Sequence, residues 1–180
     1  FLTHDGASLD ALALLAQAEH DVDARVTLLA SSEVVADAVD AALASALVDL
    51  PTREVAAASI ARGHACVADR DTIIRLANRL APEHLELAVA APESWIESLT
   101  AYGALFVHGT EAHGDYGAGP NHVLPTGGTA RFQSGLSVLT FLRTPSWLSL
   151  SEPATVSRDA AALARLEGLE AHARSAESRP

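Results

Sequence analysis

The segment from residue 114 to residue 128, GDYGAGPNHVLPTGG, concentrates residue types that serve binding sites rather than regular secondary structure. It holds five glycines, which let a backbone approach a ligand closely and adopt positive φ angles, and two prolines, which stiffen the path. Asp115 offers a carboxylate, and His113 and His122 offer ring nitrogens, so the segment can bind metal or transfer protons. A plain tight turn needs fewer special residues, and we therefore interpret the segment as the loop of a functional site.

Gln17 and His20 are three residues apart at the predicted end of a helix. Residues with this spacing lie about 60° apart on one helix face, so both side chains can reach a common point. The alternative is that His20 only caps the C-terminus of the helix, where a positive charge is favoured. From these residues alone, the capping role is the favoured interpretation.

Glu83 and His84 are adjacent in the tripeptide PEH, which follows a predicted helix. This pair suits acid–base chemistry, because histidine titrates near neutrality and a carboxylate can orient it or activate water. Adjacent residues of a strand point to opposite sides, however, so both can serve one site only where the backbone is irregular. A polar turn is the simpler alternative, and the residues alone favour it.

Glu167 and His172 form a further acid and histidine combination near the C-terminus. On one continuous helix a separation of five residues corresponds to about 140° of rotation, so the two side chains do not share a face. Without further context we interpret them as charges on an exposed helix.

The composition of the 180 residues excludes several classes of function. A formal net charge of −11 and a pI near 5.0 argue against nucleic-acid binding, which needs clustered Lys and Arg. The single cysteine, Cys66, excludes a disulfide framework and a multi-cysteine zinc site within one chain, and the absence of Lys excludes Schiff-base chemistry. No apolar stretch is long enough to span a membrane, so we expect a cytoplasmic protein. There is no Met, and we expect the sequence to be part of a longer gene product.

Short apolar runs of strand length alternate with segments of helical periodicity along most of the chain. Strands are predicted at residues 25–30, 64–68 and 104–108, and the opening FLTHDG resembles the end of a strand. Helices are predicted at residues 8–20, capped by Ser8, and at 31–47, capped by Ser32, then at 51–60, 69–80, 92–103, 134–143 and 156–177. Residues 147–151 are predicted to be a strand or extended. This alternation indicates an α/β fold with a largely parallel sheet.

Four motifs, taken in order, resemble those of the histidinol dehydrogenase family: LLAQAEHD, NRLAPEHLEL, GDYGAGPNHVLPTGGTARFQSGL and LEAHA. The resemblance runs through nearly the whole chain. It implies an α/β fold with an incomplete Rossmann-like parallel sheet flanked by helices. We expect residues 1–145 to form a partial catalytic domain that carries the zinc and acid–base residues, and residues 146–180 to form a C-terminal helical extension.

The resemblance also implies a set of site residues. The family holds one zinc ion, and the matching ligands here are Gln17, His20, Asp115 and His172. Its catalytic pair falls on Glu83, which would activate water, and His84, which would act as general base. The positions that match substrate contacts of the family are Gln17, His20, His84, Asp115, Glu167 and His172.

The activity implied is the NAD-dependent oxidation of histidinol through histidinal to histidine, in a homodimer whose subunits share active sites. Two departures stand out: the family's upstream part, including most of its dinucleotide-binding domain, has no counterpart here, and the segment between Phe106 and Gly114 is shorter than expected. NAD-binding residues are therefore not assigned. The alternatives are a related dehydrogenase of another small diol or amino alcohol, and a non-catalytic zinc-binding remnant that lacks the NAD domain.

Overall fold

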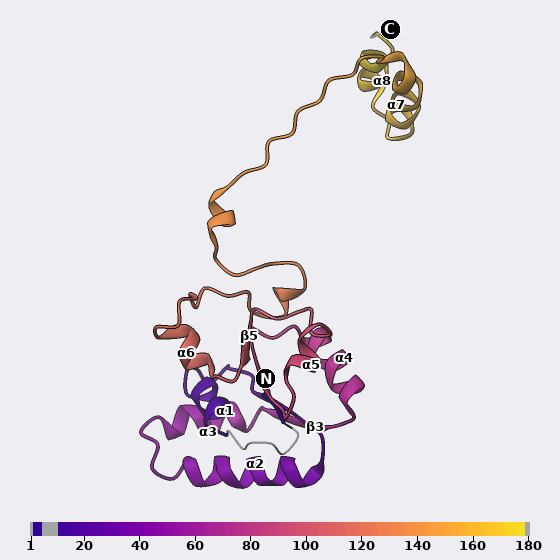
Figure 1. Ribbon diagram of the computed structural model, residues 1–180. Helices are drawn as coiled ribbons and strands as arrows, with labels where there is room; N and C mark the ends of the chain where they lie inside the picture. Colours follow the sequence, from indigo (N-terminus) through magenta and orange to yellow (C-terminus); the bar gives the residue numbers. More distant parts are fainter. Residues whose placement is uncertain (1, 5–10, 179–180) are drawn as a thin grey trace. The chain divides into compact units, whose positions relative to one another are not determined.

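The structure is a computed structural model that describes residues 2–4 and 11–178. The predicted cap Ser8 lies outside the described residues. The chain divides into two compact units, Phe1–Phe141 and Leu142–Pro180, which we call the sheet unit and the hairpin unit (Figure 1). Within the described part of the chain, no helix combines the length and the apolar character needed to cross a membrane.

The sheet unit is built on five strands that are parallel in every neighbouring pair. The strands are β1 (Leu2–His4), β2 (Thr27–Ala30), β3 (His64–Val67), β4 (His84–Ala88) and β5 (Ala104–Val107). Their spatial order is β3-β2-β1-β4-β5, so the order reverses between β1 and β4, as it does where the two halves of a Rossmann-like sheet meet. The predicted α/β class with a parallel sheet is confirmed.

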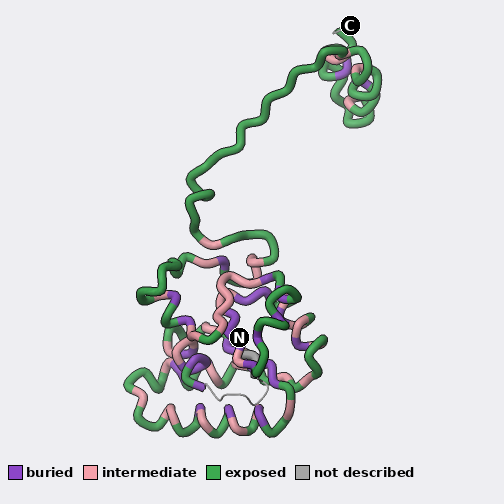
Figure 2. Tube along the Cα trace, in the orientation of Figure 1, coloured by how far each residue is buried: buried purple, intermediate pink, exposed green. Residues whose placement is uncertain are grey.

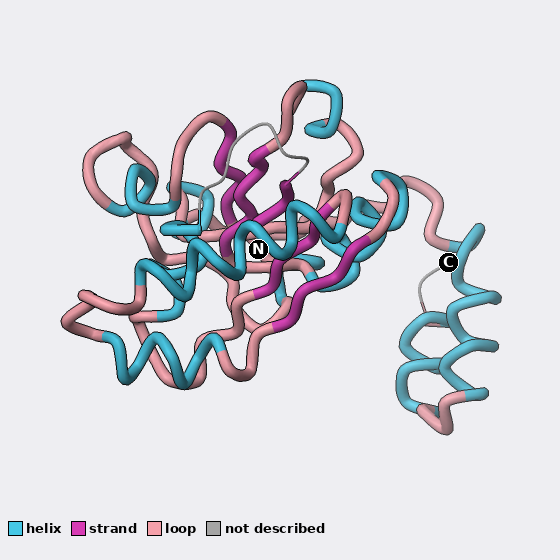
Figure 3. The backbone as a smooth tube through the Cα atoms, turned by 90° about the horizontal axis from the view of Figure 1, so that it is seen from below, coloured by secondary structure: helices cyan, strands magenta, loops and turns pink. Residues whose placement is uncertain are grey.

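Helices cover both faces of this sheet, and each face has its own apolar cluster. The first cluster joins Leu28 and Ala30 of β2 to the helices α1 (Ala11–Ala18), α2 (Glu33–Ala46) and α3 (Arg53–Ile60). The second joins Leu29 and the β4 residues Leu85 and Leu87 to α4 (Arg70–Leu80) and α5 (Glu93–Ile96). Figure 3 shows the strands side by side with helices packed around them. The alternation in β4 therefore directs Leu85 and Leu87 to one face, and His84 and Glu86 to the face that carries α1.

Several sequence predictions for the sheet unit differ from the structure. No strand was predicted over residues 84–88, whereas β4 forms there and lies between β1 and β5. The helix predicted over residues 92–103 is wrong beyond Ile96. There the Asn78 side chain accepts hydrogen bonds from the backbone N–H groups of Thr100 (2.7 Å) and Ala101 (3.3 Å) and donates one to the Ser98 carbonyl (2.8 Å). These backbone groups bond to Asn78 instead of continuing a helix.

The predicted Ser32 cap is confirmed, since its hydroxyl accepts a hydrogen bond from the Val35 N–H at 3.3 Å. The helix predicted over residues 134–143 is wrong: only a short 3₁₀ turn, Val138–Phe141, forms there. Residues 142–150 are extended and pair with no strand among the described residues.

The hairpin unit contains α7 (Ala154–Leu166) and α8 (Glu170–Glu177), where a single helix over residues 156–177 was predicted. Gly168 breaks that helix because it adopts the left-handed conformation, with φ of +77°. The rotation argument for Glu167 and His172 does not apply, because the two residues lie on opposite sides of the break, but both are exposed as predicted. Only Ala161 and Ala173 are buried in the described part of this unit, which Figure 2 shows as mostly exposed.

Candidate functional site

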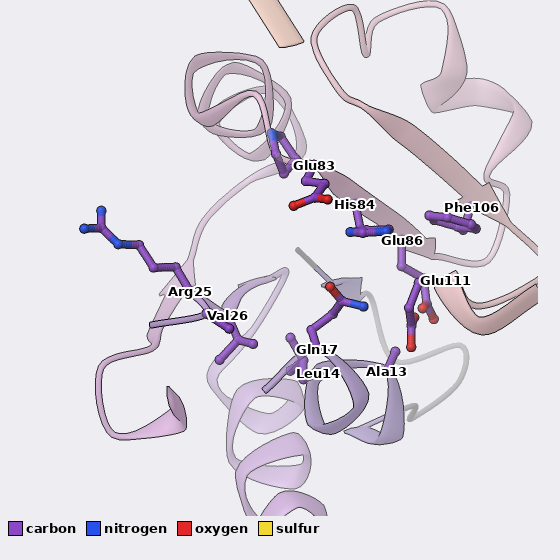
Figure 4. A pocket seen from close by; sticks show the side chains of 12 residues that line it. Ala13, Leu14, Gln17, Arg25, Val26, Glu83, His84, Glu86, Phe106 and Glu111 are labelled. Carbon is purple, nitrogen blue, oxygen red and sulfur yellow. The ribbon is translucent and has the colours of Figure 1, made fainter. Parts of the chain in front are cut away.

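Gln17, Glu83 and His84 line one pocket of about 140 Å³ at the amino end of β4 (Figure 4). Gln17 extends into it from the last turn of α1, and Glu83 and His84 extend into it from the segment that begins β4. Residues far apart in the sequence, and predicted separately as candidates, thus face a common cavity.

Glu83 and His84 are adjacent, so both can face one pocket only if the backbone between them is irregular. This is the case, because Glu83 precedes the regular strand. Helix α4 ends at Leu80 and is capped by Ala81, which is left-handed with φ of +47°, and β4 begins only at His84. The intervening backbone is held by β5 and the turn before it: the Gly103 N–H donates to the Pro82 carbonyl, and the Ala104 N–H donates to the Glu83 carbonyl, each at 2.8 Å.

Gly103 is needed for this approach. A Cβ at that position would lie 2.5 Å from the carbonyl oxygen of Glu83, which is closer than real Cβ atoms come. The absence of a side chain at Gly103 therefore lets the chain approach the Glu83 backbone closely enough for the hydrogen bonds of Gly103 to Pro82 and of Ala104 to Glu83.

Burial shifts the pKa values of the two acid–base candidates in opposite directions. It raises the pKa of the Glu83 carboxyl above its usual range, and repulsion by Asp115 raises it further while His20 partly offsets the rise. Burial lowers the pKa of the His84 imidazole, against the attraction of Asp115. His84 is therefore neutral at pH 7, the state in which an imidazole accepts a proton.

Asp115 and His20 thus act electrostatically on Glu83 and His84, although neither lines the 140 Å³ pocket. Asp115 is the last residue of the short helix α6 (Glu111–Asp115) and lines an adjacent pocket of about 220 Å³. His20 is exposed in the turn that follows α1. The sheet unit accordingly brings all of its predicted site residues into one neighbourhood.

The predicted zinc ligands are not assembled into one cluster. In the part of the chain that the structure describes, no group of three or more His, Cys, Asp or Glu side chains is placed to hold a metal. The sheet unit provides Gln17, His20 and Asp115, whose oxygen and nitrogen donors suit zinc. His172 belongs to the hairpin unit, where it and Glu167 are exposed on either side of Gly168.

The glycine-rich segment has the backbone expected of it, since Gly117, Gly119, Gly127 and Gly128 all have positive φ. Neither His113 nor His122 lines the 140 Å³ pocket, although His113 lines the 220 Å³ pocket together with Asp115. The Nδ1 atom of His113 accepts a hydrogen bond from the Thr110 N–H at 3.1 Å, which caps α6, and His122 is exposed.

The lining residues that were not predicted include Glu86, Glu111 and Phe106. Glu86 and Glu111 are buried carboxyls that extend toward each other from β4 and α6 in Figure 4. Period-two alternation from His84 would have placed Glu86 on the same face, and an i, i+4 relation links Glu111 to Asp115. For Phe106 no local signal exists, because its place depends on the pairing register of β5.

Comparisons with known proteins agree with these observations. The family model for histidinol dehydrogenase matches residues 4–180. The chain is 46% identical over 175 residues to histidinol dehydrogenase of Pseudomonas fluorescens, covering 94% of this chain and 40% of that protein. It is 49% identical over 172 residues to that of Nitratidesulfovibrio vulgaris, covering 92% and 39%. The crystal structure of histidinol dehydrogenase from Elizabethkingia anophelis superposes with a TM-score of 0.77 at 29% identity, covering 99% of this chain and 43% of that one. The chain thus spans about two fifths of the length of these relatives.

Proposed function

The chain belongs to the histidinol dehydrogenase family, and on that premise we propose that it supplies the acid–base and zinc-binding part of an enzyme of histidine biosynthesis. The reaction proposed is the oxidation of L-histidinol through histidinal to L-histidine, with NAD as oxidant. The observation that carries the proposal is the shared pocket of Gln17, Glu83 and His84, in which the neutral imidazole of His84 can accept a proton.

His84 is proposed as the general base of the alcohol oxidation. When the alcohol carbon gives up a hydride, the hydroxyl proton must leave, and His84 would take it at a ring nitrogen. Its lowered pKa keeps this nitrogen free of a proton at neutral pH.

Glu83 is proposed to serve the aldehyde oxidation. Histidinal must add water before it can lose a second hydride, and a carboxylate with a raised pKa is a stronger base toward that water. Because Glu83 is only partly buried, it can reach water at the mouth of the pocket.

The donor set Gln17, His20, Asp115 and His172 fits zinc, because its oxygen and nitrogen atoms are ligands that zinc accepts. Bound zinc would hold the substrate's imidazole and amino nitrogens, and two NAD molecules, bound in succession, would each accept one hydride. Glu167, which lies on the other side of Gly168 from His172, is proposed to accept a hydrogen bond from a cationic or N–H group of the substrate.

A homodimer with shared sites is proposed because the hairpin unit leaves apolar side chains uncovered. Leu163, Leu166 and Leu169 are 62%, 85% and 42% exposed, and they lie beside Glu167 and His172. These leucines suit packing against a second subunit.

The direct test is NADH formation from histidinol by the full-length protein, with zinc and after its removal by a chelator. Zinc-dependent NADH formation that ends in histidine would support the proposal. Turnover of another amino alcohol but not of histidinol would favour a related dehydrogenase. Zinc binding without turnover of either would favour a non-catalytic zinc-binding protein.

A further inference from the structure

Phe106 lies diagonally across from His84 on the same face of the sheet. The register of β4 and β5 pairs His84 with Ala104 and Glu86 with Phe106, so His84 and Phe106 are diagonal neighbours. Their ring centroids are 5.8 Å apart with the planes inclined by 20°, a stacked arrangement within the usual range for ring pairs. The imidazole of the proposed base therefore rests against a phenyl ring.

Helix α6 contacts the same phenyl ring through a residue without a side chain. A Cβ at Gly114 would lie 2.7 Å from Cε1 and 3.1 Å from Cζ of Phe106. Since the first distance is shorter than real Cβ contacts, any side chain at position 114 would displace the ring or the helix. Gly114 is buried, so the main chain of α6 packs directly on the ring.

We propose that Phe106 is a positioning residue, held between the His84 ring and the main chain at Gly114, that sets where the His84 imidazole lies relative to Asp115. Asp115 directly follows Gly114, so the contact that places α6 on the ring also places this carboxylate. Phe106 itself needs no contact with substrate. Only the kinetic part of the test below rests on the proposed function.

The stacking can be tested on the 180-residue chain by proton NMR, without zinc, NAD or turnover. A phenyl ring stacked on an imidazole shifts the imidazole C–H resonances upfield. The His84 resonances, identified by their loss in His84→Asn, are expected to lie upfield of those of exposed histidines. They should move downfield in Phe106→Leu and stay in place in the control Phe132→Leu, because Phe132 is 74% exposed. Unchanged His84 resonances in Phe106→Leu would overturn the proposal.

Gly114→Ala tests the same contact from the other side, and it keeps the proposal testable if Phe106→Leu does not fold. The added methyl group should shift the His84 resonances when Phe106 is present. In the Phe106→Leu background it should shift them little, because the smaller side chain makes room. Equal effects of Gly114→Ala in both backgrounds would contradict the proposal that Phe106 is held between the His84 ring and Gly114.

The kinetic part separates positioning from a merely structural role. In the full-length enzyme, Phe106→Leu is expected to lower kcat about 10- to 100-fold with little change in KM, as for a misplaced catalytic group. A normal kcat per folded molecule would show that Phe106 only supports the fold, and the proposal would fail. If His84→Asn were itself fully active, the proposed function would fail while the NMR result still decided the stacking.

Discussion

The sheet unit and the hairpin unit hold their proposed site residues in different ways. In the sheet unit, Glu83 and His84 are fixed by backbone hydrogen bonds, a glycine contact and a stacked ring, over two buried apolar clusters. In the hairpin unit, His172 is exposed on a helix pair whose described buried residues are two alanines. The difference indicates that the acid–base pair is positioned by its own unit, whereas the side chain of His172 is exposed in its unit.

Exposed ion pairs connect the two helices of the hairpin unit, which bury few apolar side chains. Arg165 of α7 donates hydrogen bonds to both carboxylate oxygens of Glu177, at 2.8 and 2.9 Å, and one to Glu170 at 3.1 Å. Both acids lie on α8, and these bonds raise the pKa of the Arg165 guanidinium and lower the pKa of both carboxyls. Salt weakens exposed ion pairs of this kind, whereas the buried apolar clusters of the sheet unit do not depend on charge.

The largest effect is expected from removing the proposed base. His84→Asn in the full-length enzyme should lower kcat about 10²- to 10⁴-fold for histidinol and histidinal alike. Glu83→Gln should slow mainly the oxidation of histidinal, where water must be activated. Separate rates with the two substrates measure this difference, and His64→Asn, at an exposed residue of β3, is the control. Equal losses at both steps in both variants would contradict the division of roles.

The second largest effect is expected from a substitution that disturbs the close backbone contact at Gly103 in the sheet unit. Gly103→Ala places a methyl group 2.5 Å from the Glu83 carbonyl oxygen and should lower the free energy of unfolding by about 2 kcal/mol or more. The matched control is Gly109→Ala, whose methyl group would meet only the His113 ring, at 3.3 Å. Urea unfolding of the two variants measures the effect, and equal midpoints would show that the close approach does not support the fold.

The sequence predicted the scaffold of the sheet unit better than its details. Apolar runs alternating with helical periodicity are local patterns, and they predicted the parallel sheet and the helices on it. Strand β4 was missed because His84 and Glu86 interrupt its apolar character, and both face the pocket. The helix after Pro92 was predicted too long because Asn78, distant in sequence, bonds to its backbone. Neither effect can be seen in a local window.

The site residues, too, could not be identified as a group from local sequence patterns. Gln17, His20, Glu83 and His84 were recognised as one group only through the resemblance of their motifs to a family, because spacing alone favoured capping and turn roles. Phe106 could not be predicted, since its contact with His84 depends on the register between two strands. Gly168 was visible in the sequence, and its positive φ shows that it ends α7.

The pH dependence should reveal the burial of the acid–base pair. Because the pKa of His84 is lowered, its basic form persists at more acid pH, and the acid limb of kcat/KM should lie below the usual histidine pKa of 6.5. The stability of the folded state should also fall at acid pH. Because the unfolded state binds this proton more readily, the stability contributed by neutral His84 is present above pH 6.5 and is lost as the pH falls through the lowered pKa of the folded state. An acid limb above pH 6.5 in the wild type would contradict this assignment.

Glu83 has the opposite sign, because its folded-state pKa is raised above the unfolded value of 4.5. Its contribution to stability is present below pH 4.5 and is lost as the pH rises through the folded-state pKa. Glu83→Gln removes this cost and should raise the free energy of unfolding at pH 7 slightly, because Glu83 is only partly buried. Thermal unfolding at pH 4 and pH 7 checks the sign, and a stabilisation that is larger at pH 4 would refute it.

The smallest effect is expected in the hairpin unit. Arg165→Ala should reduce helix content slightly, and 1 M NaCl should produce a similar reduction in the wild type but little further change in the variant. Arg158→Ala is the control, because Arg158 is exposed on α7 and forms no ion pair among the described side chains. Circular dichroism measures the difference. Identical salt responses of Arg165→Ala and the wild type would show that the Arg165 cluster does not hold the helices together.

We propose that the zinc ligands of the sheet unit are completed by His172 of another subunit. Complementation tests this proposal most directly. Asp115→Ala and His172→Ala chains, each within the full-length protein, are expected to be inactive and low in zinc when pure. After subunit exchange, each heterodimer has one site with both lesions and one with neither, so zinc content and NADH formation should partly return. Mixtures that exchange subunits yet recover neither zinc nor activity would show that Asp115 and His172 do not meet across subunits, and the shared-site account would be wrong.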